Sequence, residues 1–197
     1  MADLSTKRKN MFQRRHAYLD DFRKTVSGEY VYAGKLYSYA GEKTKNSALL
    51  RILPFAIIPF LIILACGFFH VSGMSSCAYV LLPYTAAVII SAVALWAFVH
   101  LMITKEPIRH YIFKETVPRF RRCALLTLIF SAATLIGDIV YVSINGFLTY
   151  RTGTIVFMIL HVIAIACAVF SFTSFRKIKW NFYDPETDTV SPAYEKV

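Results

Sequence analysis

The chain has 197 residues, which suits one ordinary domain, but 56% of them are hydrophobic and only 17% are charged. These proportions exclude most soluble classes of protein. The formal net charge of +10 is therefore taken as a signal of membrane orientation first and of nucleic-acid binding second.

The N-terminal region, residues 1–50, is polar and basic. Within 7–26, apolar residues recur at helical spacing among Arg and Lys residues, and they are Phe12, Leu19, Phe22 and Val26. This pattern is typical of an amphipathic helix that lies on a membrane surface rich in anionic lipid. We expect such a helix over 7–26, followed by a separate element that is rich in tyrosine.

Residues 29–42 predict a small β-hairpin, because tyrosines alternate on both sides of the Ala33-Gly34 break. The tyrosines concerned are Tyr30, Tyr32, Tyr37 and Tyr39. Because an isolated two-stranded hairpin is marginally stable in water, it needs a surface to lie on. That surface is either this chain's own helices or a separate subunit, so the four tyrosines are candidate docking residues.

Four long apolar blocks follow, at about 52–71, 78–103, 124–144 and 155–175, and they form the region 51–175. Their length matches the thickness of a hydrocarbon core, which is about 30 Å. The first block has no charged residue from Ile52 to Phe69, which disfavours a soluble helix with one face in water. The prediction is an all-α integral membrane protein with four transmembrane helices in two antiparallel hairpins.

The basic residues predict the orientation. Of the 22 Lys and Arg residues, all but Arg151 fall in the segment that ends at Arg51, in the loop between the second and third blocks, or in the tail at 176–197. The positive-inside rule then places both termini in the cytoplasm. Within the middle loop, Pro107 is expected to start a short helix and Pro118 to end it.

The third block carries an unusual run of polar residues. They fall at steps of three and four, which places them on one face of a helix, and they are Thr127, Ser131, Thr134, Asp138, Tyr141 and Asn145. We call this set the polar face. The other side of the helix, which includes Leu126, Ile129 and Ala133, is apolar and suits lipid.

His161 is the only ionisable residue within the fourth block. Asp138 and His161 are equidistant from the middle of the short loop between the two helices, so both are expected at the same depth in the membrane. An unpaired carboxylate there costs at least a few kcal/mol, which makes His161 the candidate partner of Asp138. The pair and its neighbours Ser131, Thr134 and Tyr141 are either a transport site or a set of interhelical hydrogen bonds.

The four cysteines show no metal-ligand spacing, and no cofactor motif or catalytic motif occurs. Cys66 and Cys77 either pack as small apolar residues or form a disulfide. We therefore expect a non-enzymatic protein with no metal and no cofactor, and no nucleic-acid partner. The first hypothesis is an accessory or regulatory subunit of a larger membrane complex. The alternative is a small oligomeric proton-coupled transporter or channel that uses Asp138 and His161.

Overall fold

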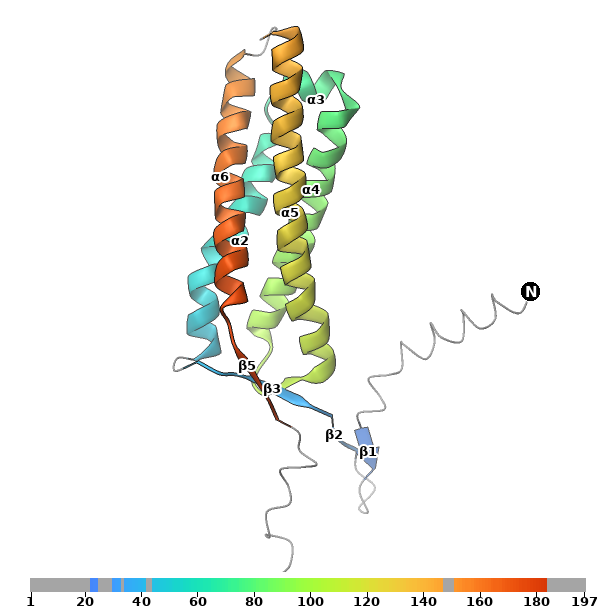
Figure 1. Ribbon diagram of the computed structural model, residues 1–197. Helices are drawn as coiled ribbons and strands as arrows, with labels where there is room; N and C mark the ends of the chain where they lie inside the picture. Colours follow the sequence, from blue (N-terminus) through green and yellow to red (C-terminus); the bar gives the residue numbers. More distant parts are fainter. Residues whose placement is uncertain (1–21, 25–29, 33, 42–43, 147–150, 184–197) are drawn as a thin grey trace, which may run out of the picture.

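The computed structural model describes residues 22–24, 30–32, 34–41, 44–146 and 151–183. Within these ranges the structure is mostly helical, and four helices are long and apolar enough to cross a membrane. They are α2 (Lys45–Cys66), α4 (Ala78–Ile103), α5 (His110–Asn145) and α6 (Arg151–Arg176) (Figure 1). This confirms the four predicted spans and indicates a multi-pass membrane protein.

The four helices form a single ring in which each packs against two neighbours. α4 contacts α2 and α5, and α6 contacts α5 and α2. The most extensive contact is between α4 and α5, which belong to different predicted hairpins. The bundle is therefore one packed unit instead of two loosely joined hairpins.

Small residues allow the close approach of α4 and α5. Gly137 of α5 lies against the start of α4, where a Cβ atom on it would be 3.3 Å from the Tyr79 carbonyl oxygen and 3.4 Å from Val80 Cγ2. Along α4, the buried face includes Ala87, Ser91 and other residues with short side chains. In lipid, the hydrophobic effect does not drive helices together, so close backbone packing is a main source of stability for the helix bundle.

α5 has 36 residues and is about 54 Å long, so it extends well beyond a hydrocarbon core of about 30 Å. It begins at His110 and continues through Pro118, so the prediction of a short helix that ends at Pro118 is wrong. Proline removes one backbone hydrogen bond, to the carbonyl of Lys114. The loss is tolerated because this turn lies outside the apolar block, where water can bind the freed carbonyl.

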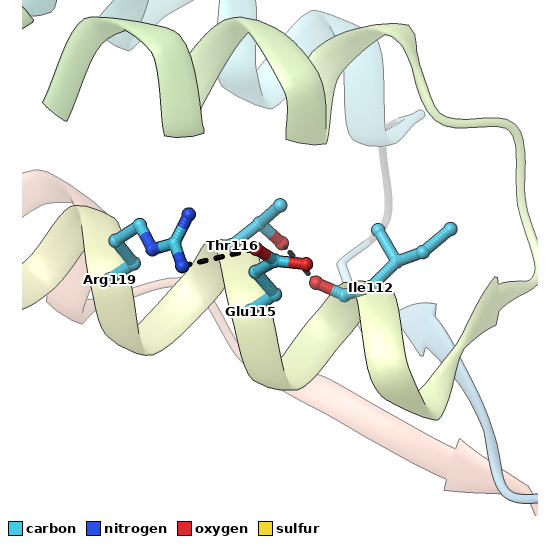
Figure 2. A network of polar contacts seen from close by, with 4 residues as sticks. All are labelled: Ile112, Glu115, Thr116 and Arg119. Atoms are coloured by element: carbon cyan, nitrogen blue, oxygen red, sulfur yellow. Dashed lines mark hydrogen bonds and ion pairs between the residues drawn. The ribbon is translucent and has the colours of Figure 1, made fainter. Parts of the chain in front are cut away.

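Figure 2 shows the polar contacts in these first turns of α5. The buried Thr116 hydroxyl donates to the Ile112 carbonyl at 2.7 Å, and Arg119 forms an exposed ion pair with Glu115 at 3.0 Å. The Arg119 guanidinium also lies 5.6 Å from the ring centre of Trp96 on α4. An exposed ion pair contributes little by itself, so the contact with Trp96 is the one that links two helices.

A small antiparallel sheet lies at one end of the bundle. Its central strand β3 (Leu36–Tyr39) pairs with β4 (Ile108–Arg109) on one side and with β5 (Trp180–Tyr183) on the other. We call this end of the bundle the sheet end (Figure 1). The opposite end, which carries the short helix α3 (Ser72–Ser76), is called the α3 end.

The predicted hairpin over 29–42 is wrong. Its first half, β2 (Tyr30–Tyr32), pairs with β1 (Phe22–Lys24), while its second half is the central strand of the other sheet. Alternation indicated strands correctly, but it carries no information about partners that are distant in sequence. The same finding corrects the helix predicted over 7–26, because Phe22–Lys24 is a strand. The rest of that range lies outside the described residues.

Lys45 joins two helices at the sheet end. Its side chain is buried, and Nζ donates to the carbonyls of Leu101, at 3.2 Å, and of Thr104. These carbonyls belong to the last turn and the C-cap of α4, where helical partners are missing. A cation is favourable there, so Lys45 links the start of α2 to the end of α4.

The contact of Gly137 with α4 yields a direct test. Gly137→Leu is expected to lower the free energy of unfolding by about 1–3 kcal/mol, because the added side chain overpacks the interface with α4. Unfolding in detergent micelles measures the change. Ala133→Leu is the matched control, because Ala133 lies on the exposed side of the same helix. Equal losses in the two variants would contradict the close α4–α5 packing.

Candidate functional site in the bundle interior

The polar face of α5 lies inside the bundle. Thr127, Ser131, Thr134, Asp138 and Tyr141 are buried, whereas Asn145 at the helix end is exposed. The residues predicted to face lipid, among them Leu126 and Ile129, are exposed. The interior of a bundle of apolar helices is thus lined along α5 by hydroxyl groups and one carboxyl group.

The two threonines of the polar face are satisfied within their own helix. The Thr127 hydroxyl donates to the Cys123 carbonyl and the Thr134 hydroxyl to the Phe130 carbonyl, each at 2.9 Å. Such back-bonding is common for hydroxyl side chains in helices and needs no ligand. Thr134 is one of the predicted site residues, and its hydroxyl proton is donated to the Phe130 carbonyl and not to another group of the site.

Asp138 is fully buried, and neither of its carboxyl oxygens has a hydrogen-bond partner among the described residues. The residue that covers it is Gly73 of α3. A Cβ atom on Gly73 would be 2.5 Å from Asp138 Oδ1 and 3.5 Å from Tyr141 Cδ1. The absence of a side chain at position 73 is therefore what allows α3 to lie over the carboxyl group.

His161 on α6 is also fully buried, in an aromatic environment. Its ring centre lies 4.2 Å from that of Phe157 and 6.2 Å from that of Tyr84. Nδ1 lies 3.1 Å from the Phe157 carbonyl oxygen, which can only accept, so Nδ1 carries a proton. In neutral His161 the other nitrogen, Nε2, is then an acceptor, and it has no partner among the described residues.

No hydrogen bond or ion pair joins Asp138 to His161 in the part of the chain that the structure describes. The expected direct pairing is therefore wrong, although both residues lie inside the bundle. Equal spacing from a loop predicts depth along the helices but not direction around them. Asp138 faces α3, whereas His161 packs against Tyr84 of α4.

The cover over Asp138 could not be found from the sequence. The sequence predicts no element between the first and second blocks, but Ser72–Ser76 forms a helical turn that folds back over the bundle. The available signal was its composition of Gly and Ser, which favours close approach of backbone to a buried group. Lys45 was missed for a similar reason, because a lysine at the edge of an apolar block suggests solvent.

Two further hydroxyl groups extend the line of polar atoms. Ser131 Oγ and Ser171 Oγ are buried and have no hydrogen-bond partner among the described residues. Ser171 also lines a central cavity of about 20 Å³ that it shares with Ser91 and Thr127. The cavity has about the size of one water molecule, but most of its lining is apolar, and the hydroxyls of Ser91 and Thr127 already donate to carbonyls of their own helices.

The tyrosine-rich segment contacts its own chain. The Tyr37 ring stacks on Phe113 of α5 with centres 3.9 Å apart, and its hydroxyl lies 3.2 Å from His110 Nδ1. The Tyr32 hydroxyl accepts from the His110 backbone N–H at 3.0 Å, and Tyr39 meets the edge of Trp180. Tyr32 and Tyr37 fasten the sheets to the start of α5, whereas Tyr39 packs within the three-stranded sheet. The side chain of Tyr30 lies outside the described residues. Docking of a further protein on this segment stays a prediction.

The described residues contain no group of three or more His, Cys, Asp or Glu side chains that could hold a metal ion. All four cysteines are free, so Cys66 and Cys77 form no disulfide. Cys66 is fully buried in an apolar cluster with Ile63 and Val71, as the packing alternative expects.

Comparison with known proteins assigns no family to the chain. It matches none of the protein-family models, curated proteins or solved structures with which it was compared. A function for the chain therefore rests on the geometry and chemistry of its site.

The contact between Gly73 and Asp138 can be tested by a double-mutant cycle. Gly73→Ala is expected to lower the free energy of unfolding by about 1–3 kcal/mol, because its methyl group would meet Asp138 Oδ1. In an Asp138→Ala background, the same change should cost much less. Ser76→Ala, at an exposed position of α3, is the control. Equal costs of Gly73→Ala in both backgrounds would show that α3 does not lie over the carboxyl group.

Proposed function

We propose that the chain is a small proton-linked membrane transporter or channel, in which Asp138 and His161 are two separate protonatable positions. The observation that carries this proposal is the burial of Asp138 with both carboxyl oxygens unpartnered among the described residues. Inside a bilayer, a charged side chain costs about 2.5–3.5 kcal/mol even on the lower experimental scales. Natural sequences keep such a residue mainly where its charge changes during function.

The surroundings of Asp138 favour a gated site. The carboxyl group is closed off from the α3 end by Gly73, on a helix of only five residues. A movement of this short segment is a small change compared with a movement of a whole span. We infer that α3 acts as the cover, which admits a proton or a small cation to Asp138 when it moves away.

His161 is suited to accept a proton from the interior. With Nδ1 hydrogen-bonded to Phe157, the lone pair of Nε2 is the available basic position. Because Asp138 and His161 do not touch, transfer between them requires water or hydroxyl groups, such as that of Ser131.

The proposed orientation puts the sheet end in the cytoplasm. Basic residues of the described segments concentrate there, including Arg51, Arg109 and Lys177, while Arg151 lies at the α3 end. This distribution follows the positive-inside rule. Both termini would then be cytoplasmic, and the cover over Asp138 would face the opposite side of the membrane.

A flux measurement tests this function. In liposomes that contain the purified protein and an entrapped pH-sensitive dye, an imposed pH gradient is expected to change the internal pH through proton flux. Asp138→Asn should reduce this proton flux at least about tenfold. His161→Phe, which keeps a ring against Tyr84, should also reduce it. Ser143→Ala serves as the control, because Ser143 is exposed on the same helix. A wild-type flux no greater than that of empty liposomes would contradict the proposal.

A second candidate function is that of an accessory or regulatory subunit of a larger membrane complex. The observation that favours it is a lateral groove of about 420 Å³ between α2 and α4 near the α3 end, lined mainly by apolar side chains such as Leu64, Val88 and Ile89. Gly67 and Thr85 also line the groove, and we infer that their small size would let a helix of another protein approach closely.

A substitution that places a large side chain in this groove tests the second candidate function. Val88→Trp is expected to reduce the amount of a membrane partner that co-purifies in mild detergent, because the indole fills the groove. Val140→Trp, on the exposed side of α5, is the control and should leave the amount unchanged. If a partner is recovered equally with both variants, it does not bind in this groove. Loss of the partner with Val88→Trp, together with unchanged flux, would separate the two functions.

A further inference from the structure

A groove lies at the sheet end, between the start of α2 and the end of α6. It has a volume of about 520 Å³, which falls in the range of small-molecule binding sites. Its lining comes from β3, α2, α6 and the segment after α6, and includes Ala48, Arg51, Phe55, Phe170 and Lys177. The polar site inside the bundle shares none of these residues.

The side chains that line the groove change from charged to aromatic along the membrane normal. Arg51 and Lys177 provide two positive charges near its outer end, and the lining contains no acidic residue. Phe55 lies one helical turn deeper than Arg51, about 6 Å along α2. Its ring centre is 4.1 Å from that of Phe170 on α6, so the deep part of the groove is aromatic.

This order of charges and rings matches the order of groups in a phospholipid. A phosphate beside Arg51 and Lys177 would make charge-assisted hydrogen bonds, and the guanidinium of Arg51 can bind two of its oxygens. The acyl chain attached to that phosphate would continue inward along Phe55 and Phe170, at the depth where lipid tails begin. A soluble phosphate would use only the outer part of the groove.

We propose that this groove binds one anionic phospholipid, with its phosphate between Arg51 and Lys177 and the start of an acyl chain against Phe55 and Phe170. The site differs from a general attraction of basic segments to anionic membranes, because it requires both the cations and the space between α2 and α6. It is also independent of the proton-linked function proposed above.

Native mass spectrometry of the full-length protein with added lipids tests the site. Wild-type protein is expected to bind phosphatidylglycerol about tenfold more tightly than phosphatidylcholine, because two basic side chains contact the anionic headgroup. The double variant Arg51→Gln, Lys177→Gln should reduce this preference to within about twofold. Soluble glycerol phosphate should not displace the bound lipid.

Two further variants keep the test specific. Arg121→Gln combined with Arg122→Gln removes two exposed charges at the same end but outside the groove, and the preference should stay as in the wild type. Ala48→Phe keeps both cations but fills the groove, and lipid binding should fall. The proposal is overturned if the two double variants lose the preference equally, or if Ala48→Phe binds phosphatidylglycerol as the wild type does. Displacement by glycerol phosphate would overturn the phospholipid as occupant.

Discussion

The constraint on which this structure depends is the lack of water inside a bilayer. Every polar group that enters the hydrocarbon region has to be satisfied by the protein or kept inside it. The chain follows this rule by turning the polar face of α5 toward the other helices and leaving the opposite face apolar. The close packing of α4 against α5, made possible by Gly137, keeps that interior closed. The exceptions include both carboxyl oxygens of Asp138 and Nε2 of His161, which are buried and have no hydrogen-bond partner among the described residues.

At the sheet end, the strands fix the ends of the helices to one another. Strand β3 pairs with β4, before α5, and with β5, after α6, so a segment upstream of α2 is joined to two later parts of the chain. Tyr37 on Phe113 and Lys45 on the last carbonyls of α4 reinforce these links. At the opposite end of the bundle, the short helix α3 lies over Asp138.

The sequence predicted what depends on local periodicity and composition. The four spans, the buried face with Ser131 and Asp138, and the buried face of α6 with His161 all follow from the spacing of polar residues. Contacts between distant segments did not follow. The pairing of β3 with β5 and the position of Gly73 over Asp138 depend on tertiary packing, which periodicity does not encode. The missing contact between Asp138 and His161 has the same cause, since depth was predictable and rotation about the helix axis was not.

Infrared difference spectroscopy of the protein in lipid membranes can detect whether Asp138 exchanges a proton inside the closed bundle. If it does, we expect a carboxyl band whose intensity changes with pH, over the range in which the protein stays folded. The band should be absent from Asp138→Asn and unchanged in Asp3→Asn, a variant far from the bundle in sequence. A spectrum in which Asp138→Asn removes no pH-dependent carboxyl band would contradict the account.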